Sequence, residues 1–182
     1  YLAGYDYVSD AIADPAMHRL IRGLMTEEVM PTLPMAEGDL ARYRDRLLER
    51  FANPALKHRT WQIAMDGSQK LPQRLLGTIR DRLEAAQPFP RLALGVAAWM
   101  RYVTGIDEAG QPIDVKDPMA ARLREIADGA GQDPVKLANG LLAVTEVFGT
   151  DLPQVAVFRD TVTNHLKSLL ENGAREAVRR VS

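Results

Sequence analysis

Side chains that bind oxygen-rich molecules are concentrated in one short segment of the sequence, HRTWQIAMDGSQKLP at residues 58–72. The segment carries an imidazole, two cations, two amides and a carboxylate, from His58, Arg59, Gln62, Asp66, Gln69 and Lys70. Such groups donate hydrogen bonds to hydroxyl oxygens or accept them from hydroxyl groups. The segment therefore suggests a binding site for a sugar or polyol.

A helix over residues 55–66 would align most of these side chains. The dipeptide Asn53-Pro54 predicts its start, because asparagine is a good N-cap and proline suits the first helical position. Side chains three or four positions apart share a helix face. That face would carry His58 or Arg59, Gln62 and Asp66, and the opposite side would pack Trp61, Ile63 and Met65.

A break after this helix would bring another cation to the same place. Gly67 and Ser68 interrupt the pattern, and Ser68 is suited to cap a following helix whose first turn holds Lys70. Donors and acceptors that converge at such a kink hold several hydroxyl groups of one ligand. The alternative is an ordinary solvated face with Asp66 as a C-terminal turn residue, and the spacing leaves both readings open.

The composition excludes several other kinds of site. The 182 residues include no cysteine, which rules out disulfides and thiolate zinc sites, and His18, His58 and His165 match no metal-ligand spacing. The net charge of −1 gives no electrostatic footprint for nucleic acid or an anionic membrane. No apolar run approaches the ~20 residues of a membrane span, and no signal peptide opens the chain. We therefore expect a cytoplasmic protein without nucleic-acid or membrane partners.

The pattern along the chain predicts an all-α fold, a single domain over residues 1–182 with about eight helices. Four dipeptides predict helix starts: Asp14-Pro15, Asn53-Pro54, Asp117-Pro118 and Asp133-Pro134. The stretch RLALGVAAWMRYV at residues 91–103 is apolar nearly all round, which is typical of a central buried helix. No segment shows the alternation of a strand.

The second half of the chain predicts one loop and three further helices. Residues 105–118 contain two glycines and two prolines, which indicates a loop with a short hairpin around Ala109-Gly110. Helical patterns follow at about 118–128, 134–148 and 154–171, with Gly149 and Gly173 as C-terminal stops. The opening YLAGYDYV predicts a half-buried aromatic helix, and its abrupt start suggests part of a longer protein.

Four stretches of the sequence carry a resemblance to a known family: YLAGYDYVSDAI, HRTWQIAMDGSQKLPQR, LALGVAAWMRYVTGID and VFGTDLP. Together they resemble the C-terminal domain of the mannitol dehydrogenase family, which are long-chain polyol and hexuronate oxidoreductases that use NAD or NADP. The resemblance covers essentially all 182 residues. Its most specific stretch, the second, is most similar to the fructuronate reductase (mannonate oxidoreductase) branch.

The resemblance implies a two-domain enzyme of which this chain is the C-terminal, substrate-binding half. The family's N-terminal Rossmann-type domain binds the coenzyme, and the substrate lies in the cleft between the domains. The family's catalytic lysine, asparagine and histidine lie upstream of the stretch that begins at Tyr1. No catalytic, cofactor-binding or metal-binding residue is therefore expected here, and we expect the chain alone to be inactive and to bind no NAD.

The resemblance also assigns substrate residues. Lys70 is the lysine of the family's D-G-S-x-K motif, and Gln62 stands eight residues earlier, where mannitol-type enzymes often have arginine. That departure favours a sugar acid such as fructuronate, reduced to mannonate, over a simple polyol. A carboxylate needs cationic partners, so Arg59 is expected to supply a second charge and His58 to assist. Asp66 and Ser68 match the motif and are expected to serve structure more than substrate.

Two other functions remain open at this level, besides mannitol 2-dehydrogenase-type polyol oxidation. One is a non-catalytic helical interaction domain, and the weaker one is a helical regulatory domain, whose expected basic patch is missing. A substrate-binding role requires Gln62 and Lys70 to converge on a concave surface. The missing domain would also leave an apolar patch at Tyr1, Leu2, Tyr5 and Tyr7, through which the chain is expected to self-associate.

Overall fold

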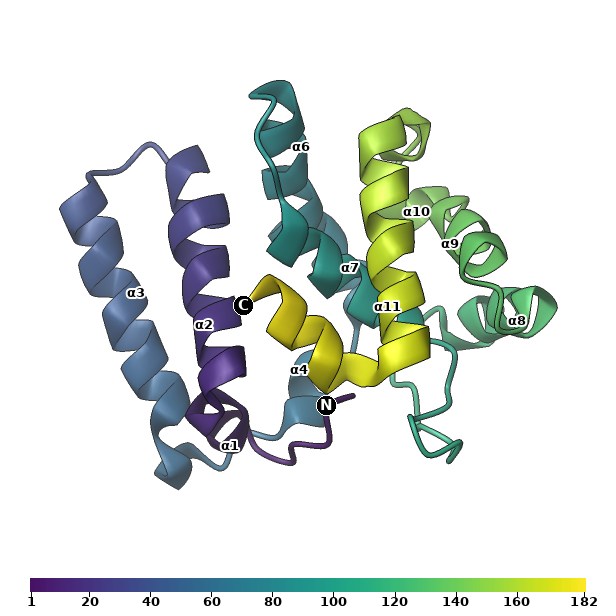
Figure 1. Cartoon of the computed structure of the whole chain (residues 1–182), viewed down its shortest axis with the longest axis horizontal. Helices are drawn as coiled ribbons and strands as arrows, with labels where there is room; N and C mark the ends of the chain where they lie inside the picture. Colours follow the sequence, from purple (N-terminus) through teal and green to yellow (C-terminus); the bar gives the residue numbers. More distant parts are fainter.

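The computed structural model describes residues 1–182 and contains no strand, only two isolated bridges, which confirms the predicted all-α fold (Figure 1). The α-helices are α1 (Val8–Ala13), α2 (Pro15–Gly23), α3 (Glu37–Ala52), α4 (Thr60–Ala64), α5 (Gly67–Leu71), α6 (Gly77–Glu84), α7 (Pro90–Tyr102), α8 (Ala120–Ala130), α9 (Pro134–Leu142), α10 (Thr145–Phe148) and α11 (Ala156–Val181). Leu24–Val29 and Pro72–Leu76 are π-helical, and Met30–Thr32, Pro54–Leu56 and Leu152–Gln154 are 3-10 turns. No helix is both long and apolar enough to cross a membrane.

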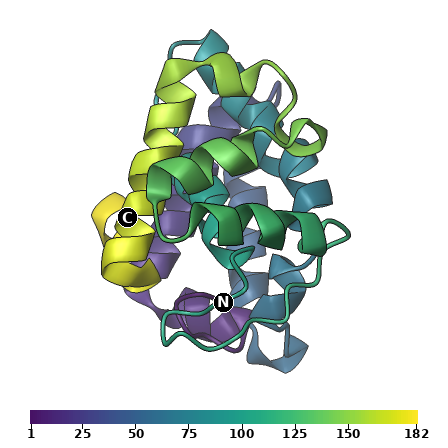
Figure 2. The same cartoon turned by 90° about the vertical axis from the view of Figure 1, so that its right-hand side faces the viewer.

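The core lies where α7 packs along α11. Leu92, Val96 and Met100 of α7 are fully buried, which confirms the central helix predicted from the apolar stretch at residues 91–103. Phe158 and Leu166 of α11 are also fully buried in the same cluster. Helices α8 and α9 cover one side of this pair, as Figure 2 shows, and α2 and α3 form an arm on the opposite side (Figure 1).

At two of the predicted aspartate–proline helix starts, the aspartate side chain caps the helix as expected. Asp14 accepts hydrogen bonds from the backbone N–H of Ala16 at 2.7 Å, and Asp133 accepts one from Val135 at 2.9 Å. The predicted helix at residues 134–148 divides into α9 and α10, and the hairpin near Ala109 forms as expected. Division of longer predicted helices explains why the structure has eleven α-helices where the sequence predicts about eight.

The N-terminus of α7 is capped by a buried carboxylate that belongs to another element of the fold. Phe89 precedes the helix and has no capping side chain. Glu28, which is 1 % exposed, accepts hydrogen bonds from the backbone N–H of Arg91 and of Leu92, both at 2.9 Å. The π-helical stretch Leu24–Val29 carries Glu28 into this position. The first turn of the most buried helix is therefore satisfied by a residue more than sixty positions away.

The two ends of the chain are joined to each other. Gly173, with a φ of 78°, kinks α11 and separates a last segment of residues 174–181. The guanidinium of Arg175 on that segment donates to the carbonyl of Ala3 at 2.9 Å and lies 4.8 Å from the ring centroid of Tyr5. Glu108 of the hairpin accepts from the backbone N–H of Ala174 at 2.5 Å, which caps the segment. The predicted helix stop at Gly173 is confirmed.

The first seven residues differ from the expectation. They form turns and a bridge rather than a half-buried aromatic helix, because Tyr7 pairs with Arg59 and the first helix begins only at Val8. The four residues predicted to form an exposed patch, Tyr1, Leu2, Tyr5 and Tyr7, do not all face solvent. Tyr1 is 44 % exposed, whereas the other three side chains are half-buried. The Tyr5 hydroxyl also donates a hydrogen bond to Asp14 at 2.6 Å. Self-association through this patch stays a prediction with a weaker basis.

Candidate functional site

The helix predicted over residues 55–66 does not form. Pro54–Leu56 is a single 3-10 turn, and Lys57 is left-handed with a φ of 46°. The chain then runs extended beside the N-terminal segment, where Val8 N–H donates to His58 O at 2.9 Å and Thr60 N–H donates to Asp6 O at 3.0 Å. Helix α4 begins only at Thr60. The prediction was wrong because these non-local hydrogen bonds replace the local helical ones.

The cation at Arg59 lies on an aromatic ring. Its guanidinium carbon is 4.2 Å from the ring centroid of Tyr7, and the two backbones form an antiparallel bridge. Arg59 is half-buried and has no acidic partner within the chain, while His58 is exposed. Arg59 precedes α4, so it does not share a helix face with Gln62 and Asp66 as the predicted helix required. It keeps an unneutralised charge near the N-terminus of α4.

Gln62 and Lys70 meet at the other end of α4. The ammonium of Lys70 donates to the carbonyl oxygens of Met65 at 2.6 Å and of Gln62 at 3.4 Å, and it is half-buried. The Gln62 side chain instead turns back and accepts from the backbone N–H of Arg59 at 3.1 Å. Lys70 therefore contacts the backbone of Gln62 and not its side chain. The side-chain amide of Gln62 caps the start of α4.

The Asp66-Gly67-Ser68 turn is fixed by a segment almost fifty residues away. Asp66 is left-handed, with a φ of 57°, and its backbone N–H donates to Lys116 O at 2.8 Å. Ser68 was expected to cap the next helix with its own side chain. Its hydroxyl and its N–H instead donate to the two carboxylate oxygens of Asp117, at 2.6 and 2.8 Å. The sequence signal at Asp117-Pro118 indicated only a helix start, so this contact was missed.

Gly67 is required by close packing against a buried indole. A Cβ at this position would lie 2.2 Å from Cδ1 and 2.3 Å from Nε1 of Trp99. Trp99 is 6 % exposed and makes an edge-to-face contact with Phe148, at 6.0 Å between ring centroids. The glycine of the motif therefore brings α5 directly onto α7.

Replacing Gly67 with alanine is expected to destabilise the fold by about 1–3 kcal/mol, because the buried indole of Trp99 has no room to move away. Gly77→Ala is the matched control in the same continuous helix, since a Cβ there meets nothing within 4 Å. The control should be neutral or stabilise by up to about 1 kcal/mol through helix propensity. Urea unfolding followed by circular dichroism measures both. Equal effects at the two glycines would contradict the packing argument.

Apolar side chains of α4 face solvent, contrary to the sequence-based expectation. Trp61 is 40 % and Ile63 is 49 % exposed, and only Met65 is half-buried. The expected packing failed for Trp61 and Ile63 because α4 has five residues and lies at the surface, whereas Met65 follows the helix. The ammonium of Lys116 lies 5.2 Å from the ring centroid of Trp61. The exposed face of α4 thus combines an aromatic ring with a nearby cation.

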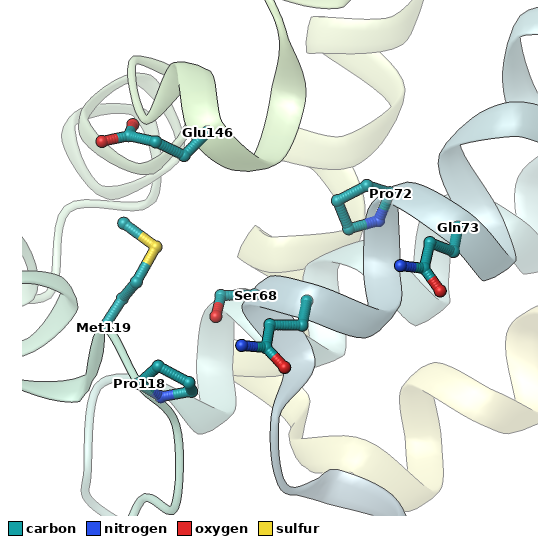
Figure 3. A pocket seen from close by; sticks show the side chains of 7 residues that line it. Ser68, Pro72, Gln73, Pro118, Met119 and Glu146 are labelled. Carbon is teal, nitrogen blue, oxygen red and sulfur yellow. The ribbon is translucent and has the colours of Figure 1, made fainter.

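Several open cavities lie on the surface, and the lining of two of them includes neither Gln62 nor Lys70. The first, of about 430 Å³, is bounded by Ser68, Gln69, Pro72, Gln73, Pro118, Met119 and Glu146. In Figure 3, Met119 and Glu146 lie across this space from Ser68. The second, of about 410 Å³, lies among α1, α2 and α3 and includes His18 and Arg22. These two cavities therefore do not provide the concave surface around Gln62 and Lys70 that the sequence-based hypothesis requires, which stays a prediction.

Local electrostatics distinguish two groups near the motif. Burial raises the pKa of the Tyr102 hydroxyl, which accepts a 3.3 Å hydrogen bond from the backbone N–H of Lys116. At the first cavity, a backbone hydrogen bond and the Arg122 guanidinium lower the pKa of Glu146. None of the residues that line this cavity is cationic, so the cavity offers no positive side chain to an anionic ligand.

Comparisons with known proteins give a consistent picture. A family model described as the mannitol dehydrogenase C-terminal domain matches residues 1–170. The chain is 51% identical over 180 residues to D-mannonate oxidoreductase of Escherichia coli, a match that covers 98% of this chain and 36% of that protein. It is 36% identical over 183 residues to mannitol dehydrogenase 2 of Saccharomyces cerevisiae, with 100% of this chain and 36% of that protein covered.

A solved structure shares the same arrangement of helices. The Pseudomonas fluorescens mannitol 2-dehydrogenase, in a ternary complex with NAD and D-mannitol, superposes with a TM-score of 0.91 at 31% identity. The superposition covers 99% of this chain and 36% of that one. The chain therefore spans little more than a third of the length of the relatives it matches.

Proposed function

Because the chain belongs to the family of mannitol dehydrogenase C-terminal domains, we propose that it is the substrate-binding part of an NAD- or NADP-dependent oxidoreductase acting on a CH–OH group. The proposed reaction is the interconversion of fructuronate and mannonate. The observation that carries this choice is the 51% identity to a D-mannonate oxidoreductase over nearly the whole chain. A cytoplasmic setting is part of the same proposal.

The coenzyme is proposed to bind outside these 182 residues. A dinucleotide of this kind binds at the carboxyl edge of a parallel sheet with a Gly-rich loop, and this chain has no strand. We therefore propose that an N-terminal Rossmann-type domain, outside this sequence, binds NAD or NADP and carries the catalytic residues. On the same ground, the chain alone is proposed to be inactive.

The proposed substrate wall is formed by the two ends of α4. Lys70 presents an ammonium at the carboxyl end, where two backbone carbonyls orient it and its third N–H remains free for a substrate oxygen. Arg59 presents a guanidinium near the other end, with the exposed His58 beside it. Gln62 lies between them, and Asp66 serves the turn through its backbone. Two separated cations suit a substrate with a carboxylate at one end and hydroxyls along its length.

Mannitol 2-dehydrogenase-type oxidation is the second candidate. It is favoured by the close superposition on the mannitol 2-dehydrogenase of Pseudomonas fluorescens. Gln62 disfavours mannitol oxidation, because the resemblance implies that mannitol-type enzymes often have arginine at this position. A neutral polyol would also make no use of the unneutralised charge of Arg59.

Replacing Arg59 with glutamine in the full-length enzyme is expected to lower kcat/KM for fructuronate at least tenfold, by about 1.4 kcal/mol. Loss of a charge-assisted contact to the carboxylate is the physical reason. Neutral fructose should be little affected, and steady-state kinetics with both substrates provides the measurement. Arg19→Gln on the exposed side of α2 is the matched control and should leave both substrates unchanged. An equal change in both substrates for Arg59→Gln would remove Arg59 from the site.

A further inference from the structure

The carboxylate of Asp117 joins two helix starts that are far apart in the sequence. One oxygen accepts from the Ser68 N–H at 2.8 Å. The other accepts from the Ser68 hydroxyl at 2.6 Å and from the backbone N–H of Met119 at 2.9 Å. Ser68 lies in the first turn of α5, and Met119 immediately precedes α8. A single negative charge therefore caps both helices, at ends whose exposed N–H groups favour an anion.

These contacts continue directly to Lys70. Lys116, the neighbour of Asp117, accepts from Asp66 N–H at 2.8 Å, so two consecutive residues hold both sides of Gly67. The Asp66 carbonyl in turn accepts from the Lys70 N–H at 2.9 Å, within the same turn. Ser68 is only 5 % exposed and Asp117 is half-buried, so these hydrogen bonds are partly shielded from water. The backbone that carries Lys70 is therefore fixed to the segment before α8.

We infer that Asp117 is a positioning residue for substrate binding, which holds the start of α5 so that the Lys70 ammonium meets the substrate. The inference rests on the proposed function, in which Lys70 binds substrate. A binding group is effective only when its supporting residues hold it within about 0.5 Å of its productive place. An asparagine at 117 keeps one acceptor but turns an amide N–H₂ toward a donor, so at least one of the three bonds is lost.

A double-mutant cycle in the full-length enzyme tests this role. Asp117→Asn is expected to raise the KM for fructuronate about tenfold and to leave the coenzyme KM unchanged. In a Lys70→Met background the same change should raise KM less than about threefold, because the group that it positions is gone. Ser68→Ala, which removes only the hydroxyl donor, should give a smaller rise of about fivefold and serves if Asp117→Asn does not fold.

The outcomes separate this inference from the proposed function. The same rise in KM with and without Lys70 would show that Asp117 does not act through it and would overturn the inference alone. A lower melting temperature with unchanged KM in Asp117→Asn would reduce Asp117 to a structural cap and would also overturn it. No effect of Lys70→Met by itself would remove Lys70 from the proposed substrate site and would overturn the inference with it, while the proposed reaction would still be tested by activity on fructuronate.

Discussion

Glu28→Ala is expected to remove about 3–5 kcal/mol of folding stability, because it takes one partner from a buried charged arrangement. The Arg91 and Leu92 N–H groups at the start of α7 would lose their only acceptor. The guanidinium of Arg91, which contacts Glu28 at 3.4 Å, would lose its buried partner too. Chemical unfolding followed by circular dichroism measures the change.

Glu27 provides a matched control beside Glu28. It pairs with the same Arg91 at 2.8 Å, but its side chain is 61% exposed and caps no helix. Glu27→Ala is therefore expected to cost less than about 1 kcal/mol, as exposed ion pairs do. If the two alanine variants lost equal stability, the ion pair rather than the capping of α7 would be responsible, and the argument for Glu28 would fail.

Lys70→Met in the full-length enzyme is expected to lower kcat/KM for fructuronate about a hundredfold, mainly through a higher KM. A hydrogen bond to a charged group contributes about 1.5–3 kcal/mol, and tenfold in kcat/KM corresponds to about 1.4 kcal/mol. Methionine keeps the length and apolar stem of lysine, so the change isolates the ammonium. Steady-state kinetics in fructuronate at saturating coenzyme gives the ratio.

The same ammonium also contacts the end of α4, so a structural effect must be separated from a binding effect. Lys136→Met on α9, where the side chain is 72% exposed, is the control and should leave kcat/KM unchanged. The melting temperature of Lys70→Met should fall by only a few degrees. A large fall in melting temperature with unchanged KM would show that Lys70 caps α4 and does not bind substrate.

Features that depend on neighbouring residues could be predicted from the sequence. Asp14 and Asp133 cap helices because the acceptor and the N–H groups lie within three positions of one another. The buried helix at residues 91–103 was predictable because apolar side chains occupy nearly every face of it. The kink at Gly173 also follows from a local preference, since glycine adopts a φ of 78° without strain.

The arrangement of the candidate site depended on contacts that no local pattern reveals. Asn53 caps a turn as its sequence context predicted, since its side chain accepts from the Ala55 N–H at 2.9 Å. The helix that should follow ends after one 3-10 turn. Backbone hydrogen bonds to Asp6 and Val8 then held residues 58–60 extended. Asp117 looked like an ordinary helix start because Ser68 is 49 residues away.

The bond between Arg175 and Ala3, which spans 172 positions, also sets an order of events during synthesis. A ribosome makes a chain from its N-terminus, so Ala3 has no partner until Arg175 has emerged. The first residues hold Thr60 and thereby the start of α4. Contacts of such long separation form slowly because a large loop must close. The α4 region is thus expected to become ordered among the last parts of the domain, after α7 and the body of α11 have packed.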